Sequence, residues 1–309
     1  MLVRRSTDAK RLKSDPALAE LAVSVDRERL REVVRTISIP RCFFKEREAN
    51  QQVAAWIAEQ FQALDVDVEF QGRYANVVAT TAAASEGPAI LIGAHYDSVP
   101  GCPGADDNAS AVAALIGAAE ALTAFHADLP FCFVAFNCEE PGLLGSADFV
   151  ENVIEKDGDG RLDIRAAHIL EMVGFTAHQP GSQKLPPGLP IKIPEVGDFL
   201  GIVANQGSGS LAGDVLGLAR TYVPELPVLS LQVLQGLEEK WPVLLRSDHA
   251  PFWTVGTPAL MWTDTSEYRN PNYHEPSDLP ETLDFVFLER ITRLVALAGF
   301  RAAVNVPSP

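Results

Sequence analysis

Residues 89–98 decide the fold class, and they read Ala89-Ile90-Leu91-Ile92-Gly93-Ala94-His95-Tyr96-Asp97-Ser98. The first six form an apolar run of strand length. An Ala-rich helix is predicted at 110–125, and the short polar residues at 106–110 suit its N-terminal cap. The next apolar run, 131–136, is typical of a strand buried on both faces. Strand, helix and strand in this order predict an α/β protein.

The same alternation continues along most of the chain. Apolar residues at helical spacing and short apolar runs predict helices at 26–37, 46–64, 110–125, 145–154, 211–222 and 283–304, and strands at 66–70, 75–80, 89–94, 131–136, 167–172, 199–204, 228–233 and 258–262. We therefore predict a single α/β domain with a mainly parallel mixed central sheet and helices on both faces. Residues 1–25 are polar and charged, and we expect an N-terminal arm before the main domain, 26–309.

The composition narrows the classes of function. The 309 residues carry a formal charge of −16, which argues against a nucleic-acid partner because phosphate binding needs a basic surface. No run of 18 or more apolar residues is apparent, so no membrane span is expected. The four cysteines are irregularly spaced and predict no disulfide framework. Without a recognisable signal peptide, a reducing, cytoplasmic location is expected.

The polar residues that follow the apolar runs are candidates for a divalent-metal site. His95 directly follows the predicted strand at 89–94; taken alone, such a histidine is more often a hydrogen-bonded core residue. Asp97 lies two residues on and can fix the imidazole tautomer, which favours a ligand. Asp107 belongs to an acidic pair that, taken alone, is better interpreted as a helix cap. The pair Glu139-Glu140 follows the strand at 131–136, and so many buried acids would repel one another without cations.

Two further candidates lie downstream. Glu171 ends a predicted strand, and its apolar setting favours a paired or ligating role over a surface one. His274 repeats the combination of an imidazole with nearby acid, although a solvent-exposed loop histidine is the simpler interpretation. Together the candidates suffice for two metals, and a metal beside a free carboxylate suits hydrolysis. For the segment Ser247-Asp248-His249, helix capping and a role in the site are both open interpretations.

Two other patterns are weaker. Cys102 and Cys138 lie beside the ligand segments, but neither has a partner at zinc-finger spacing. The acidic segment Asp157–Asp163 resembles part of a calcium loop, but His168 stands where the closing bidentate acid should be. A solvated turn is the favoured interpretation of that segment, with calcium binding left open.

These segments resemble the co-catalytic zinc exopeptidases, a family that includes bacterial leucyl aminopeptidase, glutamate carboxypeptidase and, more distantly, glutaminyl cyclase. The resemblance runs from about Glu46 to the C-terminal helix and covers five motifs in the same order. It implies two zinc ions per chain. His95, Asp107 and Glu171 would hold one of them. Asp107 would bridge to the other, held also by Glu140 and His274.

The resemblance also implies roles for residues around the metals. Glu139 would be the general base and acid, Asp97 would orient His95, and Tyr273 would place its hydroxyl near the developing oxyanion. The segment 247–252 would help to wall the substrate pocket. The chain departs from the family at two positions. Glu171 stands where the family usually has Asp, and Ala111 stands where it commonly has Gly.

A metal-dependent aminopeptidase acting on peptides is the expected function, because an acidic pocket attracts a cationic N-terminus. A glutamate-type carboxypeptidase would need a basic clamp, for which Arg246 and Arg269 are the nearby candidates. A glutaminyl cyclase would use a single zinc, but the turns at 106–110 and 142–146 look like the peptidase form. A non-catalytic member is the third alternative, which the intact ligand positions disfavour. Neither the oligomeric state nor the preferred side chain follows from the sequence.

Overall fold

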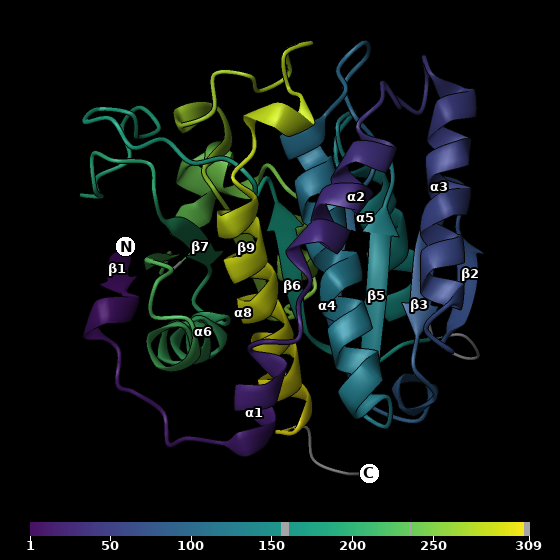
Figure 1. Cartoon of the computed structure of the whole chain (residues 1–309), viewed down its shortest axis with the longest axis horizontal. Coiled ribbons are helices and arrows are strands. Elements are labelled where there is room, and N and C mark those ends of the chain that lie inside the picture. Colours follow the sequence, from purple (N-terminus) through teal and green to yellow (C-terminus); the bar gives the residue numbers. More distant parts are fainter. Residues whose placement is uncertain (156–160, 235, 306–309) are drawn as a thin grey trace.

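The computed structural model describes residues 1–155, 161–234 and 236–305. Across these residues the chain forms one nine-stranded sheet with helices packed against it (Figure 1). The strands are β1 (Leu2–Arg5), β2 (Asp67–Gln71), β3 (Asn76–Thr80), β4 (Ala89–His95), β5 (Phe131–Phe136), β6 (Ile164–Glu171), β7 (Leu200–Ala204), β8 (Val228–Gln232) and β9 (Ala259–Thr263). Their spatial order is β1-β8-β7-β9-β6-β4-β5-β3-β2.

The centre of the sheet is parallel and its flanks are mixed. β9, β6, β4 and β5 are parallel neighbours, and β7 is parallel to β8. The pairs β1–β8, β2–β3, β3–β5 and β7–β9 are antiparallel. The predicted single α/β domain with a mixed sheet is confirmed, and the parallel pairs concentrate at its centre.

Six helices cover one face of the sheet. They are α1 (Pro16–Leu21), α2 (Arg27–Ile37), α3 (Arg47–Gln62), α4 (Ala111–His126), α6 (Gly209–Tyr222) and α8 (Phe285–Ala303). Their apolar residues join alternate strand residues, such as Ile92 and Phe133, in the largest core cluster. This alternation follows from the two-residue period of a strand, whose successive side chains point to opposite faces.

Helix α4 is apolar on nearly every side because it lies between the sheet and the helices α2 and α8. By length and composition the stretch Ala105–His126 is able to cross a membrane, contrary to the expectation from the sequence. In the structure, 72% of its most apolar window is buried, as in the core helix of a globular domain. Burial on all sides accounts for its hydropathy.

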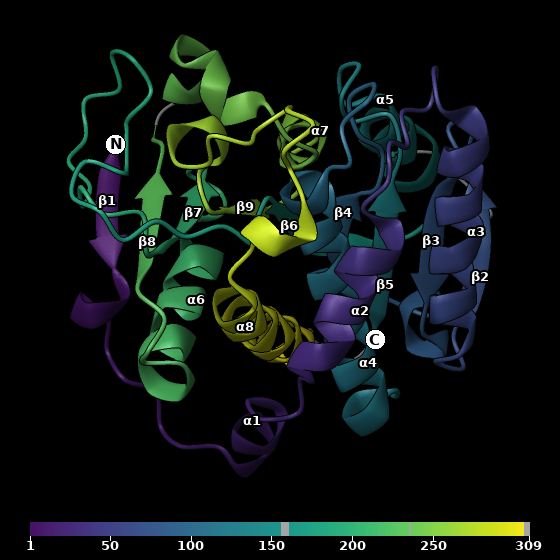
Figure 2. The same ribbon diagram turned by 45° about the horizontal axis from the view of Figure 1, so that its top comes forward.

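The other face of the sheet has two kinds of cover. Helices α5 (Leu144–Phe149) and α7 (His249–Thr254) pack over the half that contains β4, β5 and β6. Over the half that contains β1, β8, β7 and β9, the described cover comes from the loop segments 185–191 and 237–244. Figure 2 shows the first of these loops as the teal chain beside β1.

Residues 1–25 are integrated with the rest of the chain, although we expected them to extend as an arm. β1 pairs with β8 at the edge of the sheet, and Leu18 and Leu21 are buried in the main core. Asp15 accepts a hydrogen bond from the backbone N–H of Ala17 and so caps α1. The apolar residues of this segment therefore have partners that a local pattern does not reveal.

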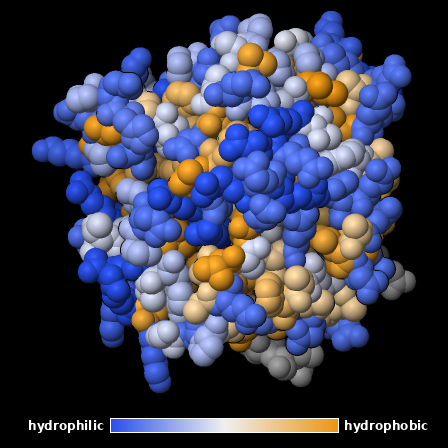
Figure 3. Space-filling view, in the orientation of Figure 1, coloured by the Kyte–Doolittle hydropathy of each residue, from blue (hydrophilic) through white to orange (hydrophobic). Residues whose placement is uncertain are grey.

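The remaining sequence predictions concern the cysteines and the surface. All four cysteines are free and buried in the structure. Residues 156–160 of the acidic segment lie outside the described part of the chain. The face of the molecule in Figure 3 is largely hydrophilic, with hydrophobic residues in scattered patches, consistent with the acidic composition.

Candidate metal centre

The candidate ligands converge at the carboxyl edge of the parallel strands. His95 is the last residue of β4, Glu171 is the last residue of β6, and the pair Glu139-Glu140 begins three residues after β5 ends. The carboxyl ends of adjacent parallel strands meet at one edge of the sheet, where α/β proteins place their ligand sites. Residues that are 76 positions apart in the chain therefore become neighbours through the sheet topology.

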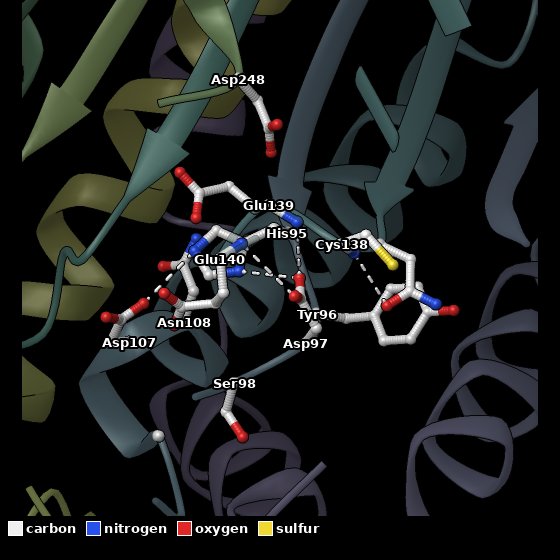
Figure 4. Close-up of polar contacts among 12 residues, drawn as sticks. His95, Tyr96, Asp97, Ser98, Asp107, Asn108, Cys138, Glu139, Glu140 and Asp248 are labelled. Carbon is white, nitrogen blue, oxygen red and sulfur yellow. Dashed lines mark hydrogen bonds and ion pairs between the residues drawn. The ribbon is translucent and has the colours of Figure 1, made fainter. Parts of the chain in front are cut away.

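Asp107 stands between two imidazoles. Its Oδ1 lies 3.3 Å from His95 Nε2, and its Oδ2 lies 3.1 Å from His274 Nε2. Glu171 Oε1 is 3.5 Å from the same His95 nitrogen, and Glu140 Oε2 is 3.2 Å from the same His274 nitrogen. The peptide bond after Asp107 is cis, and Figure 4 shows the carboxylate facing the cluster. Each carboxylate oxygen of Asp107 thus belongs to a different group of potential ligands.

The donor atoms in these groups suit zinc, which binds imidazole nitrogen and carboxylate oxygen. Two sets have ligand atoms within 4.8 Å of one another: His95 with Glu139 and Glu171, and Asp107 with Glu140 and His274. His95 Nε2, Asp107 Oδ1 and Glu140 Oε1 are buried and have no hydrogen-bond partner. Buried polar atoms without partners are rare and need an explanation, which a bound cation supplies.

The pKa shifts of the candidate ligands also favour a bound cation. Burial raises the pKa of Glu139 well above its ordinary value, and it raises the pKa of Glu140 to about 7. Burial opposes the charge of His274, but Asp107 and Glu140 outweigh it and raise its pKa to about 10. Acids that resist ionisation beside imidazoles that attract protons mark a site with excess negative charge, which divalent cations neutralise.

Asp97 lies behind His95, as the sequence predicted. Its Oδ1 is 3.4 Å from His95 Nδ1 and accepts the backbone N–H of Glu139 at 3.1 Å. Its Oδ2 is 3.4 Å from the backbone nitrogen of Glu140. One carboxylate therefore links the end of β4 to the paired acids after β5 (Figure 4).

The two neighbours Asp106 and Asp107 face in different directions. The carboxylate of Asp106 accepts the N–H of Gly174 at 2.9 Å and the side-chain amide of Asn270 at 2.7 Å. Asp278 accepts the backbone N–H groups of both acids, at 2.9 and 3.0 Å. The helix-cap interpretation is wrong for this pair, because α4 begins after it and Ser110 makes no side-chain cap. Asp106 is a structural anchor, and Asp107 alone faces the candidate ligands.

Sequence reasoning missed Arg41, which braces the loop between His95 and Asp107. Its guanidinium is fully buried and donates to the carbonyls of Tyr96, Ile39, Pro103 and Gly104. The backbone N–H of Arg41 also donates to Ser98 Oγ at 3.1 Å. An arginine in a loop ordinarily points to solvent, so only the carbonyls that surround it in the structure identify its role.

The segment around Ser247 is part of the site and does not cap a helix. Ser247 Oγ donates to Glu171 Oε2 at 2.8 Å, and Asp248 makes no side-chain cap hydrogen bond. Asp248 points toward the cluster in Figure 4, and its Oδ2 has no hydrogen-bond partner. His249 is buried, with Nε2 2.9 Å from the carbonyl oxygen of Leu244, and belongs to the packing of the domain. The capping interpretation was therefore wrong.

Tyr273 completes the rim of the site. Its ring stacks on the imidazole of His274 with centroids 3.7 Å apart, and its hydroxyl accepts a hydrogen bond from Arg246 at 2.8 Å. Burial and the surrounding carboxylates raise the pKa of Tyr273, so the hydroxyl keeps its proton. Among the described residues, neither candidate metal group contains a cysteine.

Comparisons with known proteins agree with this geometry. Residues 76–189 match the family described as peptidase family M28. The chain is 34% identical over 230 residues to the uncharacterised protein YfbL of Escherichia coli, covering 69% of this chain and 67% of that protein. It is 29% identical over 226 residues to the aminopeptidase YwaD of Bacillus subtilis, covering 71% of this chain but only 42% of that protein.

Solved structures share the fold. The LapA aminopeptidase of Legionella pneumophila matches 97% of this chain and 78% of its own, with a TM-score of 0.76 and 19% identity. BSAP, a zinc aminopeptidase from Bacillus subtilis, matches 75% of this chain and 51% of its own, with a TM-score of 0.54 and 26% identity. A glutaminyl cyclase of Porphyromonas gingivalis matches 91% of this chain and 99% of its own, with a TM-score of 0.62 and 17% identity.

The catalytic class follows from the sequence similarity, while the structures of low identity bear only on the fold. The zinc aminopeptidase among the neighbours agrees with the imidazole and carboxylate donors gathered at the sheet edge. The chain belongs to peptidase family M28 and is a metallopeptidase of the aminopeptidase type.

Proposed function

We propose that the chain binds two zinc ions and removes N-terminal residues from peptides. His95, Asp107 and Glu171 would hold the first zinc. Asp107, Glu140 and His274 would hold the second. The observation that carries this proposal is the position of Asp107, whose two oxygens face two different imidazoles at 3.3 and 3.1 Å. A carboxylate in that position would offer one oxygen to each of the two groups of candidate ligands.

Bound zinc would polarise the scissile carbonyl and lower the pKa of a water molecule to near neutrality. The Glu139 carboxylate would accept a proton from the attacking water and pass it to the leaving amine. Its environment fits this role, because burial raises its pKa and a raised pKa matches a group that must both take and give a proton near neutral pH.

The neighbours of the metals position and stabilise the reacting groups. Asp97 orients His95 through Nδ1 and fixes the backbone of Glu139, so it sets the direction of both. Tyr273 keeps its hydroxyl proton and donates it as a hydrogen bond to the developing oxyanion. Arg246, which donates to the same hydroxyl, holds the ring in place.

The two alternatives within the family have less support. A glutamate-type carboxypeptidase needs free cationic groups, but Arg269 is buried and donates to Gln183 and two carbonyls. Arg246 is paired with Glu267 and Tyr273. A cyclase with one zinc would leave one of the two candidate groups without a purpose, so both groups favour the peptidase.

The test combines metal content with activity. We expect about two zinc ions per chain and release of the amine from alanine and leucine anilides, but no release of ammonia from peptides with N-terminal glutamine. Glu139→Gln should keep the zinc and lose at least ~10²-fold in rate, because the proton acceptor is gone. Glu59→Gln, an exposed change on α3, is the matched control. An unchanged rate in Glu139→Gln would refute the mechanism.

A further inference from the structure

Two buried asparagines contact the segments that carry the candidate ligands, although neither belongs to the proposed ligand sets. Asn108 follows Asp107 in the turn before α4, and Asn270 lies in the loop that carries Tyr273 and His274. Asn108 is fully buried, and Asn270 is 1% exposed. A buried amide must find partners for both its N–H donors and its oxygen, so those partners show what each asparagine holds in place.

Asn108 bonds to the backbone on both sides of Glu171. Its Nδ2 donates to the carbonyl oxygen of Leu170 at 3.0 Å, and its Oδ1 accepts the backbone N–H of Met172 at 2.9 Å. The last residue pair of the ladder between β4 and β6 is Ala94 with Leu170. The amide of Asn108 therefore takes the place of a neighbouring strand where β4 has ended, and it fixes the backbone of Glu171 relative to its own turn.

Asn270 joins the loop of His274 to Asp106, the residue before Asp107. Its Nδ2 donates to Asp106 Oδ2 at 2.7 Å, and its Oδ1 accepts the backbone N–H of Asn272 at 2.9 Å. His274 follows two residues later with φ of +61°, a conformation that residues with a side chain rarely adopt. Such a conformation persists only where the surroundings hold it, and the amide of Asn270 is one such contact.

The two contacts divide the neighbours of Asp107 between the two groups of candidate ligands. The residue after it is bonded on both sides of Glu171, whose carboxylate lies 3.5 Å from the imidazole of His95. The residue before it is bonded to the loop of His274, whose imidazole lies 3.1 Å from Asp107 Oδ2. A carboxylate that serves both groups needs a backbone fixed relative to both segments, because ligands depend on such contacts for their orientation.

We propose that Asn108 and Asn270 are positioning residues for two different metals, with Asn108 placing Glu171 for the first zinc and Asn270 placing His274 for the second. Each acts through the backbone that carries a ligand, and neither contacts metal or substrate. This inference rests on the proposed pair of zinc ions and names the residues that hold the two sites in register.

Further hydrogen bonds hold the same segments, so the expected losses are partial. Ser247 Oγ donates to the carboxylate of Glu171 at 2.8 Å, and Asp278 accepts the backbone N–H groups of Asp106 and Asp107. Asp106 itself is a poor target, because its carboxylate also accepts the N–H of Gly174 and so contacts both segments. The two asparagines separate the segments cleanly.

The experiment titrates the zinc-free chain with Zn²⁺ by calorimetry and resolves the two binding steps. Glu171→Gln and His274→Gln show which step belongs to which site. Asn108→Ala should weaken the first site about 10- to 100-fold and leave the second within about threefold, and Asn270→Ala should do the reverse. Each variant removes one buried amide, so each is the matched control for the other. If either fails to fold, the serine variant at the same position replaces it.

A double-mutant cycle separates positioning from a general loss of structure. In the Glu171→Gln background Asn108→Ala should have no further effect on zinc affinity, whereas in the His274→Gln background it should keep its full effect on the first site. Equal weakening of both sites by each variant, or the same loss in both backgrounds, would overturn the assignment while two zinc ions in the wild type leave the proposed function standing. A wild type that binds a single zinc would instead refute the proposed pair of sites, and this inference with it.

Discussion

Replacing Arg41 tests whether the metal ligands depend on a buried cation that touches none of them. The guanidinium donates to four carbonyls of residues 39–104 and is fully buried. Burial lowers its pKa, while Asp107, Asp278 and Asp97 favour its charge. Arg41 therefore joins the loop after His95 to the turn that carries Asp107 and contributes positive charge close to the acids.

The magnitude follows from the hydrogen bonds. Arg41→Met leaves four buried carbonyls without these donors, at about 1 kcal/mol each at the low end, so we expect a loss of about 4 kcal/mol or more. That is a large part of the 5–15 kcal/mol typical of a folded domain. Arg41→Lys keeps the charge but loses the planar fork, and about half that loss is expected.

Urea unfolding with zinc bound measures the free energies, and chelator titration measures zinc retention. We expect Arg41→Lys to fold and to release zinc at a lower chelator concentration than the wild type, because Asp107 is no longer held in place. Arg35→Met, an exposed change on α2, is the control and should stay within about 0.5 kcal/mol. If Arg41→Met unfolds within about 1 kcal/mol of the wild type, the bracing role is refuted.

Three further predictions concern the backbone, the pH response and the metal. Gly104 has φ of +59°, and a Cβ there would lie 2.2 Å from the carbonyl oxygen of Asp107, so Gly104→Ala should weaken zinc binding at least about tenfold by equilibrium dialysis. Gly101→Ala, at φ +75° with open space around it, is the control; equal losses in both would exclude a specific effect on Asp107. His168 is fully buried without a hydrogen-bond partner, and burial lowers its pKa to about 3, against about 6.5 when unfolded. Between these two pKa values His168 is protonated in the unfolded chain but not in the folded one. Its effect on stability is therefore absent above pH 6.5, and stability decreases as the pH is lowered, by about 2 kcal/mol at pH 5. Urea unfolding of His168→Leu should show a decrease in the free energy of unfolding between pH 8 and pH 5 that is smaller by this amount than in the wild type. An equal decrease in both proteins would contradict this role of His168. Zinc removal should lower the thermal midpoint by about 5 °C or more, reversibly, because binding at 100 times Kd contributes about 2.7 kcal/mol. A midpoint that chelation does not move would argue against a metal at this site.

The sequence predicted the sheet well because its central strands are buried on both faces. Runs such as 131–136 are continuously apolar, and the observed β5 has the same bounds. The same logic located His95, Glu139 and Glu171, since residues that follow parallel strands meet at one edge. His274 was different. It lies in a loop far along the chain, where solvent exposure was the simpler interpretation, and the resemblance to a family assigned it to the second zinc.

Features that depend on distant partners were not predictable. β1 is a short edge strand with charged residues, and only its pairing with β8 identifies it as a strand. α7 has six residues including Pro251, which is too short for a periodic pattern. The different directions of Asp106 and Asp107 depend on the non-helical backbone of the turn, and residue type does not encode it.

The apolar residues of the domain divide into separate clusters, and the one beneath the loop segments 185–191 and 237–244 shares few members with the other two. We expect substitutions in that cluster to leave intact the packing around α4 and the packing of α5 and α7 against β4, β5 and β6. We therefore expect the effects of changes in this cluster on stability to add to, and not to alter, the effects of changes among the ligand-bearing strands. We expect the loop 185–191 to accept sequence variation with little effect on His95 at the end of β4 and Glu171 at the end of β6, so the two halves of the sheet can change independently.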